Sequence, residues 1–103
     1  MDIDFFEFLK EIRKGPKLHL GEISLFALEH FKNGYLYKEF EINGRIQHIE
    51  ILCKFQGYIE KLYGLSETTK SCFMIVRELS EDEEETFYLF FKLLDDFLDG
   101  QQE

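Results

Sequence analysis

The sequence has little of what most chemical sites require. It contains no tryptophan, a single proline and two cysteines, Cys53 and Cys72, which stand apart without a CxxC spacing or a histidine at ligand spacing beside either. A zinc site needs about four soft ligands, so the sequence predicts no metal site, and nothing in it points to a cofactor. We expect both cysteines to be reduced thiols in the core of a cytoplasmic protein.

Long apolar runs are missing as well. No stretch approaches the roughly 18 apolar residues that a membrane span needs. The first residues, MDIDFF, contain two acids where a secretory signal has basic residues followed by a long apolar stretch. The sequence therefore predicts a soluble chain that is not exported by that route. Phosphate-binding loops of the GxGxxG or GK[ST] type are absent, and so is a basic stripe with interleaved aromatic residues, which argues against nucleotide-binding enzymes and nucleic-acid binders.

Apolar and aromatic side chains, by contrast, are plentiful. Of the 103 residues, 45% are hydrophobic and 17% are aromatic, and twelve are phenylalanine. Such a chain buries enough apolar surface to offset the entropy lost on folding, and its length suits one core. We expect residues 1–103 to form a single helical domain.

The apolar residues recur at helical spacing, which predicts an all-α bundle of about five helices. The first helix ends at Gly15-Pro16, because proline cannot continue the hydrogen-bond ladder. The second begins at Ser24, a good N-cap, and ends at Asn33-Gly34, a C-cap pair. Residues 35–43 then read as an irregular or partly extended link.

Three later segments complete the predicted bundle. A broad apolar stripe predicts a helix from Ile46 to Gly64, in which Gly57 marks close packing against another helix. Residues 71–79 fit either a buried strand or a short helix, and we favour the helix because no partner strand is evident. The last helix has the clearest start, a capping box formed by Ser80 and Glu83.

The stretch GPKLHLGE, residues 15–22, holds the only proline and one of the three histidines. We interpret it as an elbow between two helices, with Leu18 and Leu20 packed beneath it and His19 facing away. None of the histidines has a nucleophile or carboxylate at a spacing that orients it locally. A small enzyme that uses His19 or His30 is therefore the weakest hypothesis.

The net charge of -9 is placed unevenly along the chain. Residues 1–77 carry 11 acids and 11 bases, whereas residues 78–103 carry 10 acids and one base, Lys92. Such a surface repels nucleic acid and anionic membranes. A basic protein partner is attracted to it.

The acids of this last quarter form two groups, and they have three interpretations: a metal site, a solvated helix face and a docking surface. The groups are Glu81, Asp82, Glu83, Glu84 and Glu85, followed by Asp95, Asp96 and Asp99. No D-x-D-x-D-G loop is present, and consecutive acids at a helix start splay around the axis, which argues against a metal. Complementarity to the helix dipole explains the first acids as well as docking does. The segregation of the whole net charge favours docking.

One stretch carries a family resemblance. FEFLKEIRKGPKLHLGEISLFALEHFKNGY, residues 6–35, resembles a pattern of small bacterial proteins. The pattern is a helix with a basic end, a proline, a hydrophobic-aromatic-Leu-Gly stretch in which this chain has His19 at the aromatic position, then Ser and an apolar residue before a helix that ends in Gly-Tyr. The tail, with three glutamates before Thr86-Phe87 and FFKLLDDF after it, is similar too. Members are often encoded among contact-dependent or polymorphic toxin systems. The resemblance implies a cytoplasmic immunity protein.

From residues and resemblance together we expect a non-enzymatic immunity protein that neutralises a cognate toxin with a basic surface, a nuclease in many such systems. The acids named above are the candidate electrostatic contacts. Tyr35, Tyr37 and Phe40 are candidate anchors, because that link has aromatic residues without helical periodicity, although closing the core explains them equally well. The alternative is a helical adaptor or regulatory protein unrelated to a toxin, in which surplus apolar surface on the last helix forms a homodimer.

Overall fold

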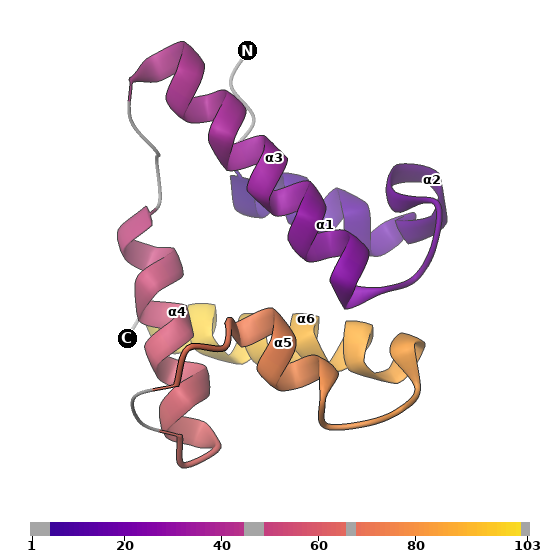
Figure 1. Cartoon of the computed structure of the whole chain (residues 1–103), viewed down its shortest axis with the longest axis vertical. Coiled ribbons are helices and arrows are strands. Elements are labelled where there is room, and N and C mark those ends of the chain that lie inside the picture. The colour runs from indigo at the N-terminus through magenta and orange to yellow at the C-terminus, as the bar shows by residue number, and fades with distance from the viewer. Residues whose placement is uncertain (1–4, 45–48, 66–67, 102–103) are drawn as a thin grey trace.

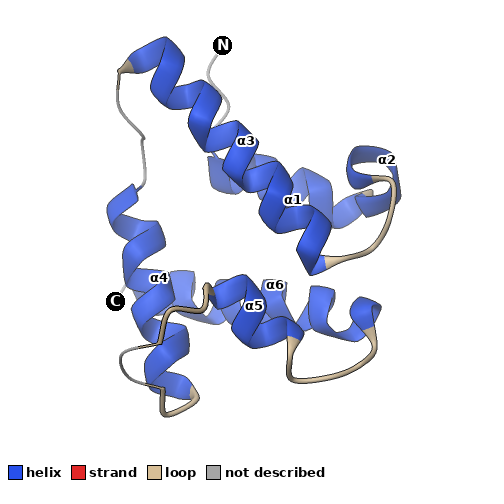
Figure 2. Ribbon diagram, viewed as in Figure 1, coloured by secondary structure: helices blue, strands red, loops and turns tan. Residues whose placement is uncertain are grey.

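The computed structural model describes residues 5–44, 49–65 and 68–101. Within them the chain forms six helices and no strand, which confirms the all-α prediction (Figures 1 and 2). The helices are α1 (Phe5–Lys14), α2 (Pro16–Leu20), α3 (Leu25–Asn43), α4 (Ile49–Leu62), α5 (Cys72–Arg77) and α6 (Glu83–Gln101). In the view of Figure 1, α3 and α5 lie in front of α1 and α6, with α4 at one side.

The core lies between these layers and is mostly aromatic. Phe90 of α6 is buried at its centre, stacked on Phe73 with 4.6 Å between ring centroids and edge-on to Phe55 at 5.5 Å. Phe97 joins the same group at 5.3 Å from Phe55. Edge-to-face and offset ring pairs of this kind add stability beyond the burial of their area. Rings from α4, α5 and α6 are thus held in one cluster.

A second group of rings holds α1 against α3. Phe8 stacks on Phe31 and on Tyr35, with centroids 5.5 Å and 5.6 Å apart, and Phe5 lies 5.2 Å from Tyr35. Phe5, Leu9 and Ile12 form the buried side of α1. The spacing of these residues is that of one helix face, so α1 presents a single apolar stripe to the core.

The helix α3 corrects two predictions. It continues through Asn33-Gly34, and residues 35–43, predicted to be irregular or partly extended, are helical as far as Asn43. Glycine inside a helix costs about 1 kcal/mol relative to alanine, and the packing of Tyr35 on α1 offsets that cost. The actual C-cap is Gly44, whose φ of 71° suits glycine and whose N–H donates to the Phe40 carbonyl at 2.7 Å.

The elbow GPKLHLGE is itself a one-turn helix, α2. Pro16 stands at its first position, where a missing N–H costs nothing, and is buried. Gly21 ends it at φ 80°. Leu20 packs against the core as predicted, but Leu18 is 85% exposed, so its predicted packing is wrong. The turn of helix rotates Leu18 outward, whereas an extended stretch places both leucines on one side.

Residues 72–77 form a helix, as favoured over a strand. Ser71 caps it by accepting a hydrogen bond from the Met74 N–H at 3.2 Å. Gln56 of α4 ties this N-terminus down: its Oε1 accepts from the Cys72 N–H at 2.6 Å, and its Nε2 donates to the Lys70 carbonyl at 3.0 Å. One side chain therefore satisfies a buried N–H and fixes α5 on α4.

Three smaller predictions are wrong. The N-cap of α6 is Asp82, whose Oδ1 accepts from the N–H groups of Glu84 and Glu85 at 2.9 Å and 3.1 Å, so Ser80 and Glu83 form no capping box. A Cβ at Gly57 meets nothing within 4 Å, so this glycine marks no close packing. Cys53 is exposed, whereas Cys72 is buried as expected.

In the described part of the chain, no helix has the length and apolar character that crossing a membrane requires.

Candidate partner-binding surfaces

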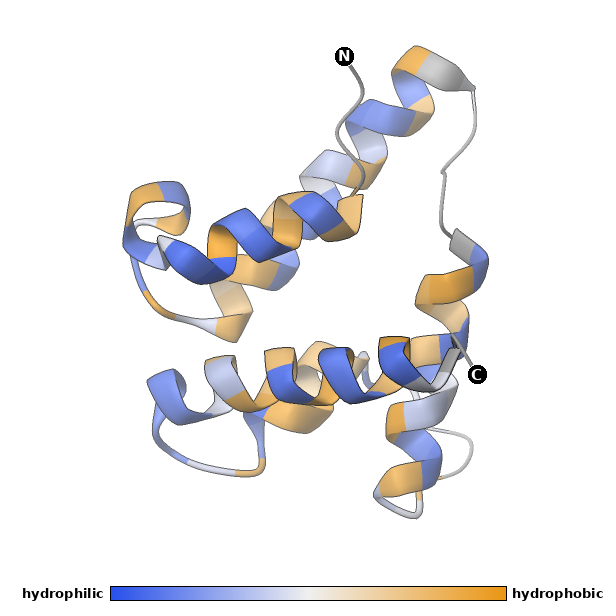
Figure 3. Ribbon diagram, turned by 180° about the vertical axis from the view of Figure 1, so that it is seen from behind, coloured by the Kyte–Doolittle hydropathy of each residue, from blue (hydrophilic) through white to orange (hydrophobic). Residues whose placement is uncertain are grey.

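The predicted acids gather on the outward side of α6. At about 100° per residue, Glu84, Asp95 and Asp99 fall along one line of this helix, with Glu85 and Asp96 beside it. The buried Phe90 and Phe97 lie on the opposite side of α6, whereas Phe91, also buried, lies one turn before Asp95 at the edge of this surface. We call this surface, with the loop before it, the acidic face; its members are Glu81, Asp82, Glu84, Glu85, Asp95, Asp96 and Asp99. From behind, α1 and α6 come to the front and show a surface with many hydrophilic positions (Figure 3).

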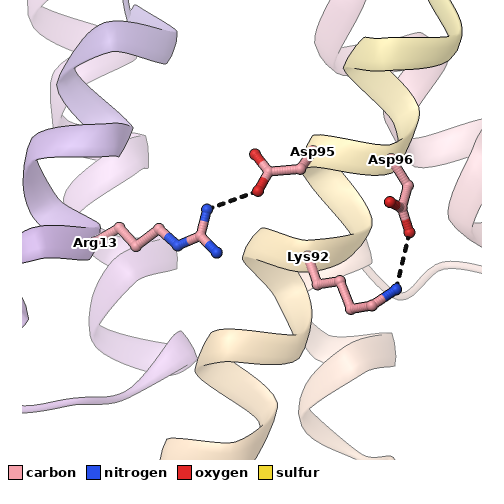
Figure 4. A network of polar contacts seen from close by, with 4 residues as sticks. All are labelled: Arg13, Lys92, Asp95 and Asp96. Atoms are coloured by element: carbon pink, nitrogen blue, oxygen red, sulfur yellow. Dashed lines mark hydrogen bonds and ion pairs between the residues drawn. The ribbon is translucent and has the colours of Figure 1, made fainter.

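Several of these acids are already engaged within the protein. Asp95 accepts from Arg13 of α1 at 2.7 Å, and Asp96 pairs with Lys92 at 3.2 Å, one turn away on the same helix (Figure 4). Glu83 lies apart from the acidic face, since its carboxylate is 3.6 Å from Arg77 of α5. Exposed pairs of this kind each contribute about 1 kcal/mol or less. They are available for exchange with an external cation.

The remaining acids differ in the hydrogen bonds and ion pairs that their carboxylates form within the protein. Asp82 is committed to capping α6, and Glu85 accepts from the Ser80 hydroxyl at 3.3 Å. Glu81, Glu84 and Asp99 form no ion pair with any described residue. All three are exposed. These three carboxylates therefore carry the least compensated charge of the acidic face.

The sequence prediction missed Tyr88, which is 40% exposed within the acidic face. It lies one turn from Glu84 and borders a groove between α1 and α6 that is also lined by Lys10, Arg13 and Asp95. The signal that identifies it is its place between Phe87 and Phe90, outside the apolar register of α6. An amphipathic ring beside carboxylates is a typical anchor for a protein partner.

The three predicted anchors divide into one core residue and two surface residues. Tyr35 packs on the rings of Phe5 and Phe8 and so closes the core. Tyr37 and Phe40 point away from the core and are 68% and 54% exposed. They lie on the far side of α3 from the acidic face, so no single surface holds all the predicted contacts.

Tyr37 and Phe40 belong to a longer row on the outward side of α3. Phe26 is half exposed, and the His30 ring meets it edge-on with 4.4 Å between centroids. Arg77 of α5 lies 5.0 Å above the Phe26 ring. We call Phe26, His30, Asn33, Tyr37 and Phe40 the aromatic row. They follow one another at alternating steps of four and three residues, which keeps them on one side of the helix.

The groups suited to covalent or acid–base chemistry do not converge. Burial raises the pKa of the Cys72 thiol to about 12, partly opposed by Lys32, so it stays protonated at neutral pH and is a poor nucleophile. His19 lies near the Phe8 ring and His30 near Phe26, on different sides of the fold, while His48 is outside the described residues. No set of three or more His, Cys, Asp or Glu side chains within residues 5–44, 49–65 and 68–101 is arranged to hold a metal ion.

Comparison of the chain with protein-family models, with curated proteins and with solved structures gave no match. The candidate surfaces therefore rest on the geometry and charge described above.

Proposed function

We propose that this chain is a non-enzymatic immunity protein that binds a basic bacterial toxin, of the nuclease type, and neutralises it by covering its active site or substrate groove. The observation that carries the proposal is the acidic face. It runs from Glu84 to Asp99 over about 22 Å at the helical rise of 1.5 Å per residue, with Tyr88 between them.

The acidic face suits such a partner for a physical reason. A nuclease binds phosphates and needs a basic cleft, which an array of carboxylates complements. Opposite charge raises the association rate toward about 10⁸ M⁻¹s⁻¹ at low salt. Glu81, Glu84 and Asp99 can pair with basic side chains of the partner without breaking an internal ion pair. Tyr88 supplies an apolar contact that stabilises the complex once it has formed.

The first test is biological. The chain is co-expressed with the toxin domain encoded by the adjacent gene. We expect it to restore growth and to co-purify with the toxin. An adjacent gene that encodes no toxin domain, or a toxin that stays lethal and does not co-purify, contradicts the proposal.

The second test locates the surface. A triple variant, Glu81→Gln, Glu84→Gln and Asp99→Asn, removes three charges from the acidic face. We expect about tenfold slower association with the toxin at low salt and a flatter dependence on ionic strength. The matched control, Glu22→Gln, Glu41→Gln and Glu50→Gln, removes the same net charge from exposed positions outside the acidic face. Equal slowing by both variants means that net charge acts without a defined face.

A second candidate function is a helical adaptor that works without a toxin. The exposed aromatic row on α3 favours it, because apolar surface of this kind marks protein contacts. A homodimer through α6 needs surplus apolar surface on that helix, and its phenylalanines are buried, so they do not support this form of the adaptor. Co-expression separates the two functions, because an adaptor leaves the toxin active.

A further inference from the structure

We propose that the aromatic row of α3 binds a second copy of this chain in a symmetric, antiparallel helix pair. The proposal does not depend on the acidic face or on the toxin. It starts from an unusual feature of α3, which carries apolar side chains on two opposite sides. One side, with Leu25, Leu28 and Phe31, packs on the rest of the fold, and the other carries the aromatic row.

The spacing of the aromatic row is that of a helix pair. Residues 26, 30, 33, 37 and 40 alternate steps of four and three, the pattern by which one helix packs along another. Asn33 stands at the midpoint, seven residues from Phe26 and seven from Phe40. A two-fold axis at Asn33 therefore sets Phe26 of one copy opposite Phe40 of the other, and His30 close to Tyr37.

The surface beside Phe26 is slightly hollowed, over a volume of about 40 Å³ that an incoming ring can cover but not enter. A small hollow between α3 and α5 is lined by Leu25, Phe26, Glu29, Phe73, Met74 and Arg77. Phe40 lies three turns beyond Glu29 on nearly the same line of α3. A two-fold axis brings matching sides of the two helices together, so Phe40 of the second copy meets this hollow, and the reciprocal contact forms at the other end.

The exposed area is sufficient for a dimer of modest affinity. Phe26, Tyr37 and Phe40 are 50%, 68% and 54% exposed, and Met74 adds a further 42% exposed side chain at the hollow. With about 200 Å² per aromatic side chain, the three rings offer about 350 Å² per copy, before Met74, His30 and Asn33 are added. Two copies thus approach the roughly 1,000 Å² at which specific interfaces begin. We expect dissociation constants in the micromolar range or weaker.

The polar members of the row fix the arrangement. Asn33 at the axis faces its own copy, and paired amides hydrogen-bond to each other across such a seam. A polar residue at a central seam position lowers stability but selects one register. The pair Asn33 to Asn33 is satisfied only when the helices are antiparallel and centred, so this residue specifies the dimer.

The first test is sedimentation equilibrium of the full chain, from about 1 μM to 1 mM. We expect a monomer–dimer equilibrium that Phe40→Ser weakens at least tenfold. The matched control is Tyr88→Ser, which removes an exposed ring from α6 and is expected to change dimerisation less than twofold. Circular dichroism and the urea midpoint verify that both variants fold. A wild-type chain that stays monomeric, or a dimer that Phe40→Ser leaves intact, overturns the proposal.

The second test examines the symmetry and does not depend on the stability of the serine variant. In a Cys53→Ser background, Asn33→Cys is oxidised with glutathione disulfide. Helices 8–10 Å apart place facing Cα atoms within disulfide reach, so we expect rapid formation of a covalent dimer. Lys10→Cys, exposed on α1, is the control and is expected to stay monomeric. Equal cross-linking of the two variants, or none at position 33, contradicts an axis at Asn33.

Discussion

The two layers of the fold present faces of opposite character. The α1 and α6 side is charged, and its contacts are exposed ion pairs such as Arg13 with Asp95. The α3 and α5 side carries exposed rings and a cation above one of them, Arg77 over Phe26. Charged surfaces mainly set how fast and with whom a protein associates, whereas buried rings set how long the complex lasts. The two faces therefore suit partners of different chemistry.

Both faces are built on the same hydrophobic core, so a core substitution is expected to have the largest effect on stability. Phe90→Ala removes a buried ring that contacts Phe55 and Phe73, which costs about 3–5 kcal/mol of unfolding free energy. Urea unfolding measures the loss. Tyr37→Ala, at an exposed ring, is the control and changes stability by less than about 0.5 kcal/mol in dilute solution, where the chain is monomeric. Similar costs for the two variants mean that the rings of α3 are not a separate surface.

The buried thiol of Cys72, beneath the exposed rings of α3 and α5, makes the stability of the protein depend on pH. The unfolded thiol of Cys72 has the ordinary pKa of 9.0, and burial raises the folded value to about 12. Below pH 9 the thiol is protonated in both states; above it only the unfolded chain loses the proton. Stability therefore falls as pH rises from 9 toward 12, by about 1.4 kcal/mol per pH unit.

Urea unfolding from about pH 8 to pH 10.5 measures this slope, with Cys72→Ala as the reference for all other titrating groups. A thiol reagent gives an independent readout, since it modifies exposed Cys53 at once and Cys72 only through opening. Identical pH profiles for the wild type and Cys72→Ala mean that water reaches the thiol, and that this side is open.

On the charged side, Asp82 both caps α6 and carries a negative charge, and two substitutions distinguish these contributions to stability. Asp82→Ala removes the cap of α6 and is expected to cost about 1 kcal/mol of unfolding free energy. Asp82→Asn keeps the cap and removes the charge, so it leaves stability within about 0.5 kcal/mol. Thermal or urea unfolding of the two variants decides the matter. A loss of the same size in both indicates that the charge itself, through the helix dipole, stabilises α6.

The smallest expected effect is at the ion pair that joins α1 to α6. A double-mutant cycle with Arg13→Ala and Asp95→Ala is expected to give a coupling energy of about 0.2–1 kcal/mol, because both side chains are substantially exposed. The coupling falls as salt is added. A coupling above about 2 kcal/mol, unchanged by salt, indicates a structural pair that a partner cannot take over.

The sequence predicted best where a helix has one apolar stripe. In α6, the spacing of Phe87, Phe90 and Phe91 predicts a helix face turned to the core, and all three are buried. In α5, Phe73 and Val76 have helical spacing, and the helix was favoured correctly. In both helices the pattern and the packing agree, because only one side meets the core.

Prediction failed where a helix has two apolar sides. In α3 the rings of Tyr35 and Phe40 lie on different sides, so the sequence shows no single helical period, and Asn33-Gly34 looks like an end. The contacts that carry the helix across Gly34 come from α1, whose Phe5 and Phe8 are distant in sequence. Local propensity alone therefore did not reveal this helix.

The charge of the acidic face could be predicted from the sequence, but the ion pairs that its acids form could not. The acids of α6 were predicted from composition, and helical spacing explains why several share one side. The engagement of Asp95 by Arg13, 82 residues away, depends on how α1 packs on α6. Tyr88 was overlooked because its neighbours Phe87 and Phe90 belong to the core.

We propose that the acidic face binds a basic toxin while the aromatic row binds a second copy of the chain. The association rate with the toxin, measured at several salt concentrations for two variants, distinguishes the two faces. The triple variant Glu81→Gln, Glu84→Gln and Asp99→Asn is expected to associate about tenfold more slowly, with a weaker salt dependence. Phe40→Ser is expected to associate at the wild-type rate. The opposite result, toxin binding lost with Phe40→Ser and unchanged in the triple variant, contradicts the assignment of both faces.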